Sequence, residues 1–206
     1  MNSGIKKIAY FSTVIILIIL SYVTLMRYNQ KDSVKSITMA ILGSERKAED
    51  YFHNEESIIE VNNGLSWYIY LDNKLGESAT ISIKIKMLDH NASSPNSTSC
   101  EASPSQVLIQ IDDYIESDDI REIPFNWIVT EVMNSNDTLV ITKVEINGQS
   151  FDTSIGPNNL NEEFRMVFEL WVLDKTIDAH IFTYDIGGDH KCVWNQICFK
   201  LEQSEL

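Results

Sequence analysis

Positions 79–87 read Ala79-Thr80-Ile81-Ser82-Ile83-Lys84-Ile85-Lys86-Met87, an unbroken alternation of apolar and polar residues. Successive side chains of an extended strand point to opposite faces, so this pattern predicts a strand with one buried face. The same alternation occurs in residues 65–71 and again in residues 164–172. No stretch after residue 35 shows an amphipathic helical repeat of three turns. The periodicity therefore predicts an all-β domain.

Further strands are expected at residues 36–42, 58–61, 107–111, 125–133, 139–146, 151–155, 180–184 and 193–201. Asn147-Gly148 between two of these strands is a strong signal for a type I′ hairpin. Asn62-Asn63-Gly64 is a second turn of this kind, which would join the strand at 58–61 to the strand at 65–71. Short strands separated by turns predict an Ig-like antiparallel β-sandwich over residues 36–202. A single closed barrel is the alternative architecture.

An uncharged apolar stretch of 19 residues, at positions 8–26, precedes this domain. As a helix it would span about 28 Å, close to the hydrocarbon thickness of a bilayer. A cleaved signal peptide is the alternative, but the exit at residues 21–26 offers no small-x-small cleavage site. We therefore expect a single transmembrane helix at residues 8–26 behind a cytoplasmic N-terminus at residues 1–7. A polar stalk at residues 27–35 would lead into the domain, and residues 203–206 would form a C-terminal tail.

The charges around the apolar stretch bear on its orientation. Lys6 and Lys7 favour a cytoplasmic N-terminus, although Arg27, Lys31 and Lys35 place positive charge on the other flank as well. Three N-x-S/T sequons, which begin at Asn91, Asn96 and Asn136, lie in polar stretches and are candidate glycosylation sites. Together these features predict a single-pass protein of the cell membrane. Its residues 8–26 would contact membrane lipid, and its C-terminal domain would be extracytoplasmic.

The composition limits the possible partners. The 206 residues include 16 Lys or Arg and 30 Asp or Glu, a net charge of −14. Residues 1–35 carry +4, so the remaining residues carry −18. Such a surface repels phosphate backbones, which excludes a nucleic-acid partner. We expect a protein partner at the cell surface, and the sequence does not identify it.

A short segment near the start of the domain carries a family resemblance. It reads Ile41-Leu42-Gly43-Ser44-Glu45-Arg46-Lys47-Ala48-Glu49-Asp50-Tyr51. It resembles the I-L-G-x-x-x-K-A-x-D-Y signature of an archaeal membrane-protein family of unknown function, domain-of-unknown-function family sixteen-sixteen. Ordered landmarks follow: a Ser/Pro-rich loop at residues 91–104, a strand with Phe168 to Val172, and a closing segment at residues 194–199. The resemblance implies a membrane-tethered extracytoplasmic β-domain without an assigned activity.

The signature also has a structural interpretation. Gly43 can supply a backbone turn after the strand, and Asp50 and Tyr51 can cap that turn and close the end of the sandwich. Many family members have several membrane spans before this domain, whereas this sequence has one apolar stretch. We expect a structural role for the signature rather than a binding role.

The three cysteines are Cys100, Cys192 and Cys198. Outside the cytoplasm they are disulfide candidates. Cys192 and Cys198 would lie about 20 Å apart in a straight strand, too far to bridge, whereas Cys100 lies in the polar loop at 91–104 and can reach Cys192. We predict a Cys100–Cys192 disulfide with Cys198 buried. Pairing of the leftover thiol between chains is the alternative.

A copper or zinc site is the alternative to a non-catalytic role. His190, Cys192 and Cys198 offer imidazole and sulfur ligands, and Asp189 and His180 are further candidates. No C-x-x-C or H-x-x-x-H spacing is present, so the favoured interpretation has no metal and no cofactor. Clustered carboxylates at positions 112–119 suit calcium, but the EF-hand spacing is absent.

The sequence contains no G-x-S-x-G elbow, no H-E-x-x-H motif and no Gly-rich phosphate loop. Acidic runs at 112–113, 116–119 and 162–163 are expected to be solvated surface, and the loop at 91–104 is expected to be too polar to pack. The four tryptophans lie in strand patterns and are expected in the core: Trp67, Trp127, Trp171 and Trp194. A pilin has the same layout, but its processing signal is missing. We predict a non-enzymatic interaction or envelope module.

Overall fold

The computed structural model describes residues 15, 19–21, 35–53, 56–135, 138–159, 162–186 and 189–202. The chain divides into two units, Met1–Lys35 and Ser36–Leu206, and this boundary coincides with the expected start of the domain. In the first unit, Ile15 and residues 19–21 are helical. Among the described residues, no helix is both long enough and apolar enough to span a membrane. Most of the predicted transmembrane helix and stalk, like the tail at 203–206, lies outside the described residues.

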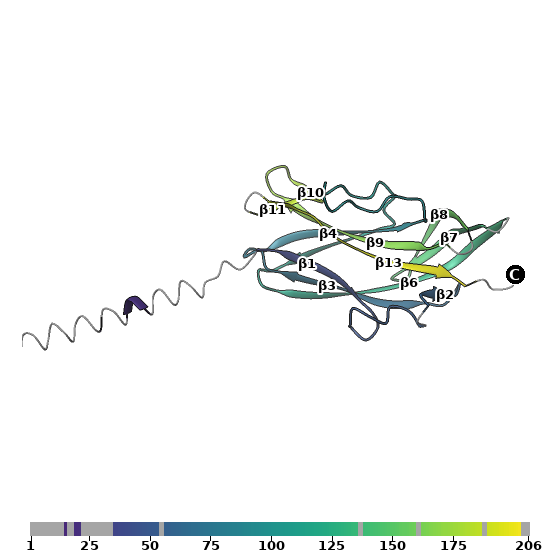
Figure 1. Ribbon diagram of the computed structural model, residues 1–206, viewed down its shortest axis with the longest axis horizontal. Coiled ribbons are helices and arrows are strands. Elements are labelled where there is room, and N and C mark those ends of the chain that lie inside the picture. Colours follow the sequence, from purple (N-terminus) through teal and green to yellow (C-terminus); the bar gives the residue numbers. More distant parts are fainter. Residues whose placement is uncertain are drawn as a thin grey trace, which may run out of the picture. The chain divides into compact units, whose positions relative to one another are not determined.

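Two packed β-sheets form the second unit (Figure 1). The first sheet has the order β1-β3-β6-β7-β8, with bounds Ile37–Leu42, Leu65–Asn73, Ile120–Ser135, Thr138–Ile146 and Gln149–Asn159. The second has the order β2-β13-β9-β4-β5, with bounds Ile58–Ile59, Val193–Leu201, Phe164–Asp174, Ala79–Leu88 and Ile109–Ile115. β10 (Ala179–Ile181) also pairs with β9, and β11 (Tyr184–Ile186) pairs with β12 (Asp189–Lys191). Within these sheets only the short β2–β13 pairing is parallel.

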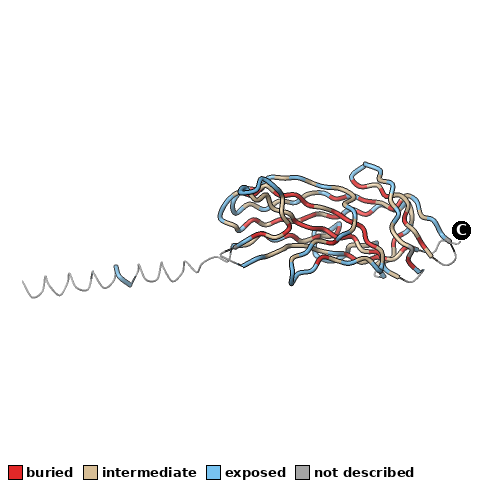
Figure 2. The backbone as a smooth tube through the Cα atoms, turned by 90° about the horizontal axis from the view of Figure 1, so that it is seen from above, coloured by how far each residue is buried: buried red, intermediate tan, exposed pale blue. Residues whose placement is uncertain are grey.

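The core lies between the two sheets, as the red backbone in Figure 2 shows. The apolar positions of the alternating stretch in β4 all point into it and are at most 5% exposed: Ala79, Ile81, Ile83, Ile85 and Met87. Aromatic rings join the layers, because Phe125 of β6 lies 5.2 Å from Phe168 of β9, centroid to centroid. The predicted antiparallel all-β sandwich is therefore confirmed, and the closed barrel is not formed.

One of the two predicted turns forms a hairpin, and the other connects the two sheets. Asn147 and Gly148 join β7 directly to β8, and their φ angles of 50° and 79° are those of the predicted hairpin turn. The turn at residues 62–64 instead joins β2 of the second sheet to β3 of the first, so it is a connection between sheets. A turn sequence sets the local reversal, but the choice of neighbouring strand depends on tertiary packing.

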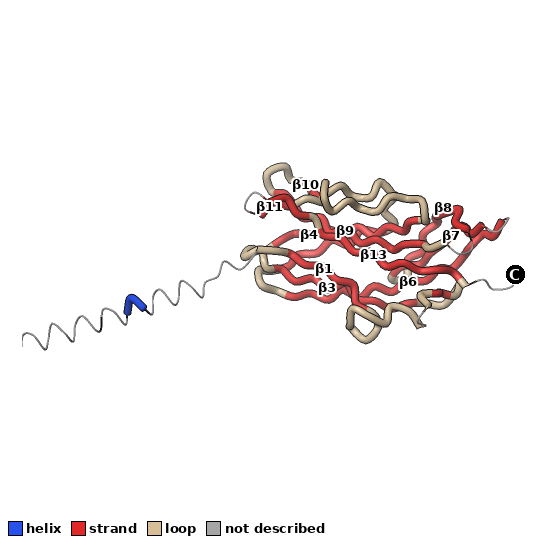
Figure 3. Tube along the Cα trace, viewed as in Figure 1, coloured by secondary structure: helices blue, strands red, loops and turns tan. Residues whose placement is uncertain are grey.

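Residues 89–108, which connect β4 to β5, lie along the outer face of the second sheet (Figure 3). We call this segment the strap. The sequence predicted that residues 91–104 would be too polar to pack, and this is wrong. Buried charged side chains of the sheet bind the strap through hydrogen bonds, so the strap needs little apolar surface of its own.

Candidate functional site

A buried ion pair lies beneath the strap. Lys86 of β4 and Glu169 of β9 have side-chain exposures of 4% and 0%, and Lys86 Nζ lies 2.9 Å from both carboxylate oxygens. The ammonium also donates to the carbonyl oxygen of Ser103 (2.5 Å), and the Ser103 N–H donates to Glu169 Oε1 (2.8 Å). Trp171 Nε1 donates to the other carboxylate oxygen at 3.1 Å. Each charge thus has several partners, as burial of an ion pair requires.

Arg165 of β9 fixes the first part of the strap. Its Nη2 donates to the carbonyl oxygens of Asp89 and Ala92, both at 2.6 Å, and its Nη1 donates to Ser94 Oγ at 2.7 Å. A guanidinium presents several donors in one plane, so one side chain can hold several turns of irregular backbone.

The predicted Cys100–Cys192 disulfide is present and fixes the distal part of the strap, with Cα atoms 5.5 Å apart. Trp194 Nε1 donates to Ser97 Oγ at 3.0 Å, and Thr183 Oγ1 donates to the Cys100 carbonyl oxygen at 3.3 Å. The strap is therefore held covalently and by hydrogen bonds from both β9 and the C-terminal segment.

The tryptophans divide between two places. Trp67 and Trp127 are in the core, as predicted. Trp171 and Trp194 lie on the outer face of the second sheet, so their predicted core position is wrong. Strict alternation gives the two tryptophans outward positions on β9 and β13. Both side chains are half-buried there. The Lys84 ammonium lies 3.3 Å from the Trp171 ring centroid, and burial, followed by the Lys86 charge, lowers the pKa of Lys84.

The candidate metal ligands do not form a site in the described part of the chain. Cys192 is bonded to Cys100, and His190 is exposed on β12. Cys198 was predicted to be buried but is only half-buried, because it alternates with the buried residues Ile197 and Phe199 on β13. Burial, and then the neighbouring Glu163, raises the pKa of its thiol. Among the described residues, no three His, Cys, Asp or Glu side chains converge as metal ligands.

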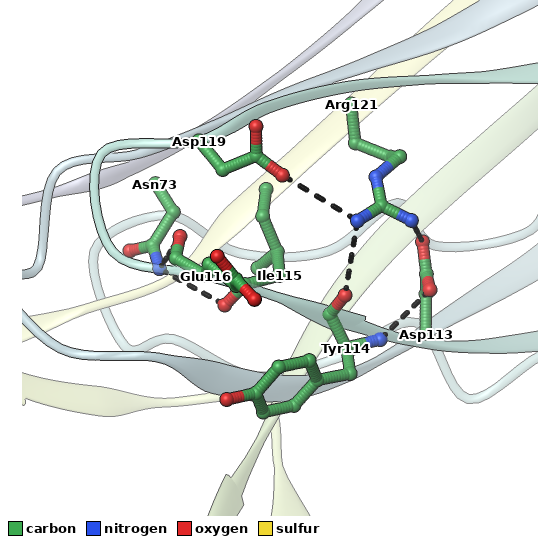
Figure 4. A network of polar contacts seen from close by, with 7 residues as sticks. All are labelled: Asn73, Asp113, Tyr114, Ile115, Glu116, Asp119 and Arg121. Carbon is green, nitrogen blue, oxygen red and sulfur yellow. Dashed lines mark hydrogen bonds and ion pairs between the residues drawn. The ribbon is translucent and has the colours of Figure 1, made fainter.

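The acidic stretch at 112–119 covers the end of β5 in the second sheet and its crossing to β6 in the first. Figure 4 shows Arg121 between two of its carboxylates, 3.6 Å from Asp113 Oδ2 and 3.4 Å from Asp119 Oδ2. Asn73, which is fully buried, donates from Nδ2 to the carbonyl oxygens of Glu116 (2.9 Å) and Glu77 (2.9 Å). The side chains here stabilise the crossing instead of gathering around a cation.

Sequence reasoning missed Asn73, although a signal for it existed. It continues the buried register of β3, which runs from Leu65 through every second residue, so it is a polar residue at an apolar-face position. Asn195 is a comparable case on β13, where its Nδ2 donates to the Met39 carbonyl oxygen of the opposite sheet at 2.7 Å. Such positions point to side chains that satisfy irregular or edge backbone.

The signature segment closes one end of the sandwich. A Cβ on Gly43 would clash with the carbonyl oxygens of Glu49 and Asp50, which explains the glycine. Tyr51 donates from its hydroxyl to the Ile41 carbonyl oxygen at 2.9 Å, and its ring packs edge-on against Trp67 with centroids 6.1 Å apart. The predicted structural role agrees with these contacts. Lys47 and Ala48, the other signature residues of the turn, are exposed.

The candidate glycosylation sites fall in different places. Asn91 and Asn96 are exposed in the strap, and Asn96 Oδ1 accepts the backbone N–H groups of Thr98 and Ser99. Asn136 lies outside the described residues. Glycosylation of all three stays a prediction.

β10 and β11 lie at one end of the sandwich (Figure 1). Residues of both strands line a pocket of about 310 Å³. The β3–β4 turn, the end of β9 and parts of β10 and β11 line it. Its wall includes Leu75, Val172 and Ile181, and its rim carries the charged residues Glu77, Asp174, Lys175 and Asp185. In the described part of the chain, the polar outer surface of the strap and this pocket are therefore two surface features to consider.

No protein-family model and no curated protein sequence matches the chain. The second unit belongs to the class of antiparallel β-sandwiches, and a strap lies across one of its sheets. Solved structures with partial similarity include the CARDB domain of the PF1109 protein from Pyrococcus furiosus, solved in complex with di-metal ions. It has 8% sequence identity and a TM-score of 0.41, over 82% of this chain and 90% of that one.

Two further solved structures show weaker similarity, each again at 8% identity. Spo0M, a sporulation control protein from Bacillus subtilis, has a TM-score of 0.38 over 82% of this chain and 50% of that one. β-Glucuronidase 2 from Bacteroides uniformis has a TM-score of 0.32 over 79% of this chain and 13% of that one. Scores of this size do not place the chain in any of these groups.

Proposed function

We propose that the chain is a non-catalytic, membrane-anchored module with an Ig-like extracytoplasmic β-sandwich that binds a protein partner at the cell surface. The observation that carries this proposal is the disulfide between Cys100 and Cys192, which fixes the strap to the C-terminal segment. Disulfides persist in oxidising compartments and are rare in a reducing cytosol. A strap that depends on such a bond suits a domain outside the cytoplasm.

The organisation of the strap supports a binding role. Binding residues are often found on loops that a rigid scaffold positions. Here residues 96–99, which read Asn-Ser-Thr-Ser, are exposed at the surface. The Cys100–Cys192 disulfide and the hydrogen bond from Trp194 to Ser97 hold this part of the strap. Hydroxyl and amide side chains on a fixed loop supply adaptable hydrogen bonds to a partner.

The anchor rests on sequence: the uncharged stretch at residues 8–26 is long enough to span a bilayer as a helix. The resemblance to the archaeal membrane-protein family supports the same arrangement. The charge of −18 on residues 36–206 suits an exposed, soluble surface and opposes binding to nucleic acid.

Fractionation of cells that express the full chain tests the anchor. The protein should stay with the membranes after an alkaline carbonate wash and leave them only in detergent. A variant in which Ile16, Ile18 and Leu20 are each replaced by Asp serves as the matched control and should appear in the soluble fraction. Release of the unchanged chain without detergent would overturn the anchor.

Differential alkylation in intact cells tests the compartment. Cys100 and Cys192 should react only after reduction, whereas Cys198 should be recovered as a thiol and serves as the internal reference. Recovery of Cys100 and Cys192 as free thiols before reduction would overturn the extracytoplasmic location.

A further inference from the structure

The pocket at the β10–β11 end of the sandwich has a preformed apolar wall. Leu75 packs against the core, and Tyr184 is only 7% exposed. The Tyr184 hydroxyl donates to the carbonyl oxygen of Ile37 at 3.3 Å, which fixes the ring, and burial raises the pKa of this phenol. Val172 and Ile181 complete the wall from β9 and β10. At about 310 Å³ the pocket is at the small end of the range for ligand sites, so it fits one side chain or a small molecule.

The rim of the pocket is acidic. Its charged lining residues are Glu77, Asp174, Asp185 and one basic residue, Lys175. Asp174 accepts hydrogen bonds from the side chain (2.6 Å) and the backbone N–H (2.7 Å) of Thr176, and these bonds lower the pKa of its carboxyl group. Three carboxyl side chains and one lysine at the rim disfavour an anionic ligand.

One ion pair at the rim places a cationic side chain beside Glu77. Lys175 Nζ lies 3.9 Å from Glu77 Oε2, and the two side chains are 69% and 73% exposed. An exposed ion pair of this kind is weak. An incoming cation can displace Lys175 and take its place beside Glu77.

We propose that this pocket receives an arginine or lysine side chain of a partner protein. The aliphatic stem would lie against Leu75, Val172 and Ile181, and the cationic head would meet the rim carboxylates, as long basic side chains do at surfaces that are part apolar and part charged. A purely apolar ligand would make no favourable interaction with the carboxylates of the rim. A metal ion is disfavoured because, in the described part of the chain, no three His, Cys, Asp or Glu side chains converge.

The charge of the whole body favours the same partner. Residues 36–206 carry −18, a field that attracts a basic surface and speeds its encounter. This inference rests on the proposed interaction role and specifies the chemistry of the partner. Its test measures binding by the purified protein, so its outcome is separate from the tests of membrane attachment and oxidation.

The experiment uses the full chain in a neutral detergent, with methyl groups of Ile, Leu and Val labelled for NMR. The probe is Nα-acetyl-arginine methylamide, and its neutral isostere Nα-acetyl-citrulline methylamide is the matched probe. The arginine probe should shift the methyl signals of Leu75, Val172 and Ile181 saturably at millimolar concentration, and the citrulline probe should not. No shift with arginine, or an equal response to citrulline, would overturn the proposal.

Variants test whether the arginine probe binds at this pocket. Glu77→Gln should weaken binding about 2- to 5-fold, the range expected for one exposed ion pair. Lys175→Met should strengthen it, because the internal competitor is lost. Glu131→Gln is the matched control, since Glu131 forms a similar exposed pair with Lys143 at 3.5 Å on the other sheet. Equal weakening by Glu77→Gln and Glu131→Gln, or weaker binding by Lys175→Met, would place the probe elsewhere.

Discussion

Lys86 and Glu169 occupy outward positions on β4 and β9, where strict alternation predicts contact with solvent. The strap instead covers both, so the outer face of the second sheet has a small polar interior. The sequence predicts the direction in which each side chain points. It does not predict that the two meet, because the pairing of β4 with β9 joins segments about 80 residues apart. The ion pair is therefore a tertiary feature that no local pattern contains.

The first prediction concerns this pair. Lys86→Met removes the cation and leaves a buried carboxylate, which should lower the free energy of unfolding by about 3–5 kcal/mol. Urea unfolding of the variant and of the unchanged chain measures this loss.

Lys143→Met is the control for that experiment, because Lys143 forms only exposed ion pairs with Glu131 and Asp152. Its effect should stay within about 0.5 kcal/mol. A loss for Lys86→Met no larger than that of the control would contradict a stabilising role for the buried pair.

The second prediction concerns Gly43 in the signature turn. Gly43→Ala forces the new Cβ against the carbonyl oxygens of Glu49 and Asp50, so the turn must shift and Tyr51 must lose its position beside Trp67. We expect a loss of about 1–3 kcal/mol in the free energy of unfolding. Gly64→Ala is the matched control, because its Cβ would lie 3.9 Å from the nearest atom, the Trp127 carbonyl oxygen. Equal losses for the two variants would contradict the steric role of Gly43.

Among the elements, the strands could be predicted and the strap could not. Alternating apolar residues locate β3, β4 and β9 nearly to their ends. β6 is longer than its apolar run, because residues 120–124 pair with β3 although Pro124 and two charged residues interrupt the pattern. The strap has no apolar periodicity, so its position is set by Arg165 and by buried charges on other strands. Of the contacts that hold the strap, only the Cys100–Cys192 disulfide was predicted, from the spacing of the cysteines.

The third prediction concerns that tether. A bridge between residues 92 apart should stabilise the fold by about 4–5 kcal/mol from chain entropy, as an upper value. Cys100→Ser with Cys192→Ser should therefore lower the free energy of unfolding and open the strap near residues 96–99 to protease. The segment held by Arg165 should stay protected, because its hydrogen bonds do not depend on the bridge.

Limited proteolysis with mass spectrometry measures this order of opening. Cys198→Ser is the control, since Cys198 is not in the bridge and should leave the cleavage pattern unchanged. Cleavage that begins near Ala92 instead of residues 96–99 would contradict the division of the strap into two separately held parts.

At the scale of the whole molecule, charge is the property that the sequence predicts most directly. Residues 36–206 carry −18, and most ion pairs among the described residues involve exposed side chains, as in the Glu77–Lys175 and Lys143–Asp152 pairs. Exposed pairs contribute little, whereas repulsion among many like charges opposes the compact state. Repulsion should therefore dominate the electrostatic part of the stability of the body.

The fourth prediction follows from this balance. Raising NaCl from about 20 to about 200 mM shortens the Debye length to below about 10 Å and screens the long-range repulsion. The melting temperature of the body should then rise by about 2–4 °C, the shift that corresponds to roughly 1 kcal/mol in a domain of this size.

CaCl₂ at the same ionic strength should give a similar rise, because Arg121 already lies between Asp113 and Asp119. A fall with NaCl would mean that ion pairs dominate after all, and a much larger rise with CaCl₂ would mean that the carboxylates of the β5–β6 crossing bind calcium. Differential scanning calorimetry of the full chain in neutral detergent separates these outcomes.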